Sequence, residues 1–166
     1  MSRTRPKAHV ACPAATRVPP MFVLIVGAGR VGSTIAKRAL NDGHEVSVLD
    51  EDPLSHERLD VDLDGSWEDA GGQFTVGTAL EMEALLEAGI ERADVFIAST
   101  DGDNTNLVIS QIAQKRFAVD RVVARVLDPA RASWYAEQGL NTVCPTKTAI
   151  ELLTAAVFGP DQEAAA

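Results

Sequence analysis

Residues 22–32 read FVLIVGAGRVG, and this stretch decides the fold. Its first five residues are an uninterrupted apolar run, which is typical of a strand buried on both faces. Glycines at 27, 29 and 32 then follow with G-x-G-x-x-G spacing, and residues 30–40 repeat apolar side chains at helical intervals. A strand, a glycine turn and a helix in this order predict the first unit of a dinucleotide-binding α/β fold.

Each glycine of this motif has its own expected role. Gly27 permits a tight turn, Gly29 lets the backbone approach a pyrophosphate, and Gly32 lets the helix pack close to the strand. The amino end of the helix offers free N–H groups and the positive end of its dipole to a phosphate. Arg30 either reaches that phosphate or points to solvent. The motif therefore predicts a nucleotide site, with a glycine turn that serves packing alone as the alternative.

A carboxylate at the end of the second predicted strand complements the glycines. Residues 45–49 form this strand, and Asp50 follows it, 18 residues after Gly32. An acid in this place accepts hydrogen bonds from both ribose hydroxyls and repels a 2′-phosphate. We therefore expect NAD(H) or an adenine nucleotide (ATP, ADP or AMP) rather than NADP, with a solvated strand-end acid as the alternative. Asp52, directly before Pro53, is expected to cap the next helix.

The rest of the chain keeps alternating short apolar runs with helical segments. Further strands are expected at residues 74–76, 95–98, 121–126 and 142–144, helices at 54–59, 81–88, 103–116, 129–138 and 146–158, and a polar loop at 65–72. Six strands alternating with helices predict a Rossmann-like, doubly wound parallel sheet in three layers. Ligands bind such sheets at the carboxyl ends of the strands.

Two later segments also reach that edge. Ser99 and Thr100 follow the strand at 95–98 and should face the nucleotide, while Asp103 or Asn104 should cap the helix that begins there. Arg125 lies near the carboxyl end of the strand at 121–126. A guanidinium buried in that position needs a phosphate or an acid partner.

Composition and charge exclude several classes of protein. With 166 residues, 46% of them hydrophobic, the chain is long enough for one domain with a core. No apolar run approaches the roughly 20 residues needed to span a bilayer. Two cysteines, Cys12 and Cys144, cannot form a disulfide framework or a four-ligand zinc site alone, so no metal site is expected. Residues 1–20 carry +4, and subtracting this from the total of −9 leaves −13 on the rest, which disfavours nucleic acid as a partner.

The two ends of the chain are expected to lie outside the domain at residues 21–158. Residues 1–20 contain four prolines and no periodic pattern, so we expect a disordered arm, and Met21 is an alternative start. Residues 159–166 should form a loose tail. The final helix carries Ile150, Leu153 and Val157, and it either contacts another subunit or packs on its own sheet.

Catalytic side chains are scarce. None of the three histidines, His9, His44 and His56, follows a predicted strand, and Tyr135 has Gly139 rather than a lysine four residues on. The simplest interpretation is that the nucleotide is sensed and not consumed, and that the protein is not an enzyme. A minimal NAD-dependent oxidoreductase is the competing class.

Several motifs, taken in order, carry a resemblance to a known family. They are VGAGRVG at 26–32, VLDEDP at 48–53, GTA at 77–79, LLEAGI at 85–90, ADVFIA at 93–98, GDNTN at 102–106, RVVARV at 121–126 and DP at 128–129. From about residue 21 to residue 158 the chain resembles the N-terminal domain of regulators of potassium conductance, the RCK or TrkA-N type of bacterial Trk and Ktr potassium-uptake systems.

The resemblance implies a nucleotide site and residues that form it. It places Arg30 and Arg125 near phosphate, Asp50 at ribose, and Thr100 and Asn106 along the site. The complete set of candidate contacts is Gly27, Gly29, Arg30, Val31, Gly32, Asp50, Glu51, Thr78, Ser99, Thr100, Asn106 and Arg125. The family's usual Gly-Asp-Ala-Thr turn reads Gly-Thr-Ala-Leu at 77–80, so the acid of that turn is missing.

The resemblance also implies a role and partners. Such a domain is a cytoplasmic regulatory subunit that gates a membrane potassium channel or transporter and stays at the membrane through that partner. It pairs with itself in a dimer or larger ring, or with a related RCK subunit. A chain without the C-terminal ligand domain of many relatives would lack the ligand sensed there. An assembly partner of a longer relative that does no sensing is the remaining alternative.

Overall fold

The structure is a computed structural model that describes residues 19–159. The expected disordered arm and loose tail fall almost entirely outside these residues. All six strands are parallel and lie in the order β3-β2-β1-β4-β5-β6. This order confirms the predicted Rossmann-like, doubly wound α/β fold.

The elements follow the predicted alternation. The strands are β1 (Phe22–Val26), β2 (Glu45–Asp50), β3 (Gln73–Val76), β4 (Val95–Ala98), β5 (Arg121–Arg125) and β6 (Asn141–Val143). The helices are α1 (Arg30–Asn41), α2 (Glu57–Asp60), α3 (Met82–Glu87), α4 (Asp103–Lys115), α5 (Pro129–Glu137) and α6 (Pro145–Phe158), with short 3₁₀ turns η1 (Pro53–His56) and η2 (Ile90–Arg92).

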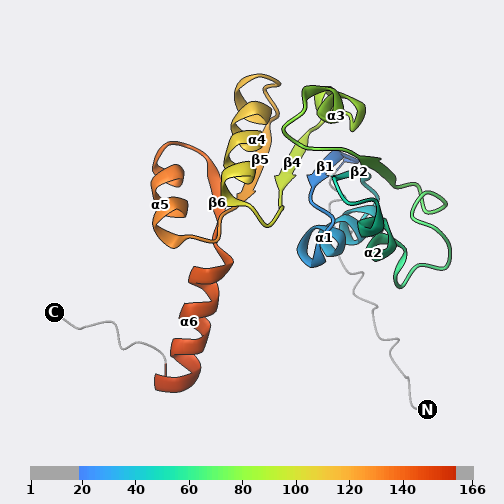
Figure 1. Ribbon diagram of the computed structural model, residues 1–166. Coiled ribbons are helices and arrows are strands. Elements are labelled where there is room, and N and C mark those ends of the chain that lie inside the picture. Colours follow the sequence, from blue (N-terminus) through green and yellow to red (C-terminus); the bar gives the residue numbers. More distant parts are fainter. Residues whose placement is uncertain (1–18, 160–166) are drawn as a thin grey trace, which may run out of the picture.

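The central strand β1 separates two hydrophobic cores. Its side chains alternate: Phe22, Leu24 and Val26 pack with α3, α4 and α5, whereas Val23 and Ile25 pack with α1 and α2. Figure 1 shows α1 and α2 next to β1 and β2, and α4 against β5. All five residues of β1 are buried, as the apolar run predicts. The sheet is therefore the middle of three layers.

The direction in which successive strands are added to the sheet changes at β1. It runs from β1 outward to β2 and β3, and then crosses through α3 to β4, which pairs with the other side of β1. The loops after β1 and β4 therefore leave the sheet toward opposite faces. Rossmann-like sheets bind ligands at such a switch point.

The loop expected to be polar contains a fully buried tryptophan. Trp67 has 0% exposure and belongs to the core on the α1–α2 face. Its indole Nε1 donates a hydrogen bond to the carbonyl of Gln73 at 3.0 Å, and its backbone N–H donates to Asp60 at 2.8 Å. A side chain on Gly72 would collide with the indole ring. Trp67 thus anchors the connection between α2 and β3 to this core.

The last helix leaves the sheet. No residue of α6 is buried, and Leu153 and Phe158 are 66% and 81% exposed. Figure 1 shows α6 extending away from β6. Of the two alternatives for this helix, packing on its own sheet is therefore wrong. Among the described residues, no helix has both the length and the apolar composition to cross a bilayer.

The two tryptophans provide a test of the loop anchor. We expect Trp67→Ala to lower the free energy of unfolding by about 3–5 kcal/mol, because it removes a buried indole from a closed core. Trp134→Ala should cost no more than about 1 kcal/mol, because Trp134 is 55% exposed. Urea unfolding followed by circular dichroism measures both changes, and equal losses would contradict the anchoring role.

Candidate functional site

A cavity of about 640 Å³ opens at the carboxyl edge of the sheet. This volume falls within the roughly 300–1,000 Å³ that is usual for small-molecule sites. The loops after β1, β2, β3 and β4 and the end of β5 contribute residues to the cavity wall. Ten of the candidate contacts line it: Gly27, Gly29, Arg30, Val31, Asp50, Glu51, Thr78, Ser99, Thr100 and Arg125.

The amino end of α1 forms one wall of this cavity. A Cβ on Gly32 would lie 1.8 Å from the carbonyl oxygen of Gly27, so the helix begins in direct contact with the turn after β1. Gly32 does not line the cavity; its role is the close packing that the motif predicts. Gly27 itself has φ +98°, a conformation that favours glycine.

The first turn of α1 is open to a ligand. Its N-cap is Gly29, which supplies no side-chain acceptor, and a Cβ built on Gly29 meets nothing within 4 Å. The first N–H groups of a helix have no partner within the helix. Unpaired donors, the helix dipole and the free space next to Gly29 together fit a phosphate group.

Asp50 holds the glycine turn in place. Its Oδ2 accepts a hydrogen bond from the N–H of Ala28 at 2.6 Å, and its Oδ1 accepts one from the N–H of Asp52 at 2.9 Å. An ionised carboxylate has about four acceptor positions, so each oxygen keeps one for a ribose hydroxyl. The bracing role was not foreseen from the sequence. Asp52 caps η1 through the N–H of Leu54 at 2.9 Å, as predicted.

Asn106 stands behind the cavity and not along it. Its side chain is fully buried and donates to the carbonyls of Thr100 and Arg125, both at 2.9 Å. Its Oδ1 accepts from the N–H of Thr100 at 3.0 Å and from the hydroxyl of Thr100 at 2.7 Å. The expectation that Asn106 lines the site is wrong, because the backbone of two loops and the Thr100 hydroxyl use its whole hydrogen-bonding capacity. Asn106 instead positions Thr100 and Arg125.

Arg125 brings a partly buried cation to the cavity. One guanidinium nitrogen, Nη2, donates to the carbonyl of Thr100 at 2.6 Å. Its Nε is buried and has no hydrogen-bond partner among residues 19–159, and within these residues Arg125 makes no ion pair with an acid. The sequence left two partners open for Arg125, a phosphate or an acid. No acid partner is found among residues 19–159. A partly buried guanidinium without an acid partner fits an anionic ligand group.

Two side chains at the β4–α4 connection make hydrogen bonds that were not expected. The Ser99 hydroxyl donates to the carbonyls of Val26 and Gly27 at 3.1 and 3.0 Å, so it holds the turn as well as lining the cavity. The N-cap of α4 is Gly102, which makes no side-chain cap. Asp103 accepts from the backbone N–H groups of Leu127 and Asp128 instead, at 2.7 and 3.0 Å.

The expectation that Asp103 or Asn104 caps α4 is therefore wrong. Both residues already lie within the helix, where their side chains turn away from its first N–H groups. Asp103 reaches the loop before α5, and Asn104 accepts a hydrogen bond from Arg131 at 2.6 Å.

Further residues belong to the cavity wall, and two of them, Ser55 and Arg58, come from a segment that the sequence did not connect with the site. Ser55 and Arg58 line the cavity from η1 and α2. The Ser55 hydroxyl is buried and has no hydrogen-bond partner among the described residues. Three residues apart on a helical segment, the two share one face, and only that spacing could have indicated them.

A pair of glycine substitutions tests the geometry of the turn. We expect Gly32→Ala to lower the free energy of unfolding by about 1–3 kcal/mol or more, because its Cβ would overlap the Gly27 carbonyl. Gly29→Ala should change it by less than about 1 kcal/mol, because Gly29 has φ −65° and open space. Urea unfolding of both variants measures the difference, and similar losses would contradict the close approach of α1.

Comparison with known proteins agrees with this geometry. The TrkA-N domain family matches residues 23–146. The Trk system potassium uptake protein TrkA of Streptomyces coelicolor is 39% identical over 134 residues, which are 80% of this chain and 57% of that protein. The chain thus spans little more than half of that relative's length.

Solved structures share the fold at lower identity. The Kef C-terminal domain of Shewanella denitrificans, solved in an AMP-bound form, superposes with a TM-score of 0.66 at 23% identity, over 82% of this chain and 79% of that one. The GsuK channel bound to NAD superposes with a TM-score of 0.67 at 21% identity, over 84% of this chain and 24% of that one. From β1 to the start of α6, the chain belongs to the TrkA-N domain family.

Proposed function

We propose that this domain binds an adenine nucleotide and, through it, regulates a membrane potassium transporter. The observation that supports this proposal is that a guanidinium and a carboxylate lie at different places along the edge of the sheet: Arg125 ends β5 and Asp50 ends β2, with β1 and β4 between these strands. We assign the Arg125 side to phosphate and the Asp50 side to the sugar. To the phosphate side we also assign the open amino end of α1 and the space at Gly29.

The charges of the cavity support this orientation of the ligand. Arg30 and Arg125 both line it, and α1 adds the positive end of its dipole. Asp50 and Glu51 follow β2, where a sugar can donate hydroxyl hydrogens to them. A nucleotide in the reverse orientation would set phosphate against the three carboxylates at and after the end of β2, those of Asp50, Glu51 and Asp52, which Coulomb repulsion disfavours.

The proposed ligands are NAD(H), ATP, ADP or AMP. The names of two related structures state that those proteins bind AMP and NAD. Asp50 disfavours NADP, because a 2′-phosphate would meet its carboxylate. Arg58, however, adds a guanidinium to the cavity wall. NADP therefore belongs in any test of ligand choice.

We propose that the nucleotide is sensed and not consumed. Within residues 19–159, the cavity lining holds no histidine, tyrosine, lysine or cysteine, so the usual general acids, bases and nucleophiles other than carboxylates and hydroxyls are missing there. Relatives carry the name of a potassium uptake protein. A regulatory switch requires a coupling of only ~1–3 kcal/mol between the nucleotide site and the transporter.

The proposed partners are a potassium channel or transporter subunit and a second RCK-type subunit. The exposed apolar side chains of α6, with Ile150 at 54% and Val157 at 70% exposure, support a contact with another subunit. The domain would act at the inner face of the membrane through its partner. A nucleotide that changes how paired domains sit would then act on the transporter.

Thermal unfolding with nucleotides tests the binding step. We expect saturating NAD, NADH, ATP, ADP or AMP to raise Tm, because a ligand that binds only the folded state stabilises it; at 100 times Kd the gain is about 2.7 kcal/mol. NADP should raise Tm less at equal concentration. Gly29→Ala should fold normally and lose the shift, since its methyl group enters the phosphate space. A Tm that no nucleotide changes would contradict nucleotide binding.

Affinity capture from native membranes tests the regulatory role. We expect the tagged full chain to retain a potassium transporter subunit, and the amount retained to change when the saturating nucleotide is added. Gly29→Ala should retain the transporter without responding to nucleotide. Capture that is unaffected by nucleotide in the unmodified chain would leave only the assembly role and contradict sensing.

A further inference from the structure

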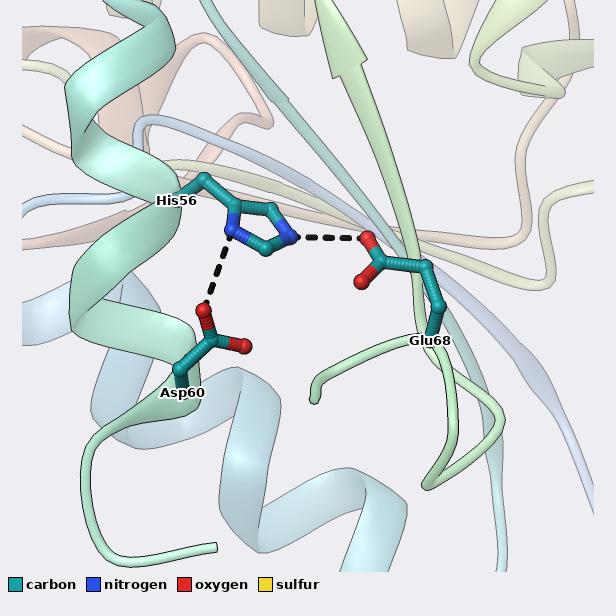
Figure 2. A group of neighbouring side chains, drawn as sticks. All are labelled: His56, Asp60 and Glu68. Atoms are coloured by element: carbon teal, nitrogen blue, oxygen red, sulfur yellow. Dashed lines mark hydrogen bonds and ion pairs between the residues drawn. The ribbon is translucent and has the colours of Figure 1, made fainter. Parts of the chain in front are cut away.

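A second group of functional side chains lies outside the nucleotide cavity. His56 at the end of η1, Asp60 at the end of α2 and Glu68 in the loop before β3 come together, and none of them lines the cavity. Figure 2 shows the imidazole between the two carboxylates. Its Nδ1 is 3.3 Å from Asp60 Oδ2, and its Nε2 is 2.8 Å from Glu68 Oε1.

When the His56 imidazole is neutral, this group offers too few hydrogen-bond donors for its two carboxylates. A neutral imidazole carries one N–H, and ionised carboxylates only accept hydrogen bonds. A neutral His56 can therefore satisfy one of its two carboxylate neighbours and not both. A cation removes the conflict, because it binds one ring nitrogen and carboxylate oxygens together and so gives each carboxylate a positively charged partner.

We propose that His56, Asp60 and Glu68 bind a divalent transition-metal ion of the Zn²⁺ type. One atom from each residue lies within 4.8 Å of the other two. Ligands on tetrahedral Zn²⁺ at 2.0–2.2 Å are about 3.3 Å apart, the separation already found between His56 and Asp60. The Glu68 side chain is 52% exposed and free to close the remaining gap. An imidazole nitrogen favours Zn²⁺ over Mg²⁺ and Ca²⁺, which prefer oxygen ligands.

The ligands are held by the surrounding structure. The second oxygen of Asp60 accepts the N–H of Trp67 at 2.8 Å, which leaves Oδ2 directed at His56. Trp67 is fully buried and fixes the segment that carries Glu68. Phe74 packs edge-on against the imidazole with ring centroids 5.0 Å apart. Such outer contacts orient metal ligands before the ion binds.

The local charge also favours a dication. Residues 57–69 contain six acids, Glu57, Asp60, Asp62, Asp64, Glu68 and Asp69, against the single Arg58, so this short segment carries −5. The electric field of a surface region with charges of one sign concentrates counterions there. A bound ion would link the α2–β3 loop to the segment that supplies Ser55 and Arg58 to the cavity.

Titration of the metal-free chain tests this proposal without any nucleotide. In Trp134→Phe, Trp67 is the only tryptophan left, and it is the chain neighbour of Glu68. We expect ZnCl₂ to change its fluorescence in a saturable, one-to-one manner and to raise Tm, with MgCl₂ at equal concentration producing neither effect. No saturable response to Zn²⁺, or an equal response to Mg²⁺, overturns the proposal.

Substitutions in the same acidic segment distinguish a specific metal site from nonspecific attraction of cations to the acidic surface. His56→Gln and Glu68→Gln should each raise the Kd for Zn²⁺ at least ten-fold. Glu57→Gln and Asp64→Asn remove a charge from the segment without touching the group, and should leave that Kd within two-fold. Circular dichroism shows whether each variant is folded. Equal Kd values for all four variants would mean diffuse binding to the acidic surface and would overturn the site. Because nucleotide is absent throughout, the result is independent of the proposed nucleotide binding.

Discussion

The contact between the first turn of α1 and the carbonyl of Gly27 is the constraint on which the candidate site depends. It exists because Gly32 has no side chain; even a methyl group would overlap that oxygen. The same turn receives Asp50 of β2 at the N–H of Ala28, and the Ser99 hydroxyl after β4 at the Gly27 carbonyl. Three strands therefore hold one loop, and α1 directs its free N–H groups into the cavity.

The polar residues of the cavity are organised before any ligand arrives. Asn106 orders Thr100 and holds the carbonyl of Arg125, and Thr100 in turn accepts the Arg125 guanidinium. Buried polar groups that are already paired do not have to be reorganised on binding, and the Arg125 guanidinium has no acid partner among residues 19–159. The cavity thus offers an anion the donors that the protein itself leaves unused.

One short segment connects the two sites. This segment consists of η1 and α2, residues 53–60. Ser55 and Arg58 face the nucleotide cavity, whereas His56 and Asp60 face the loop before β3. The helical turn places these pairs on different sides of the segment. Its position is fixed by Asp52 at its start and by Trp67 beyond its end.

The sequence by itself determined the parts of this protein that depend on local pattern. Apolar runs and helical periods identify the strands and helices, and the parallel-sheet rule brings Gly27, Asp50, Ser99 and Arg125 to one edge, because parallel strands end on the same side. Contacts between distant segments were decided by the tertiary structure. The burial of Trp67, the bracing by Asn106, the partner of Asp103, the isolation of α6 and the meeting of His56 with Glu68 have no periodic signal. Each arises only when packing selects which polar and aromatic groups face one another.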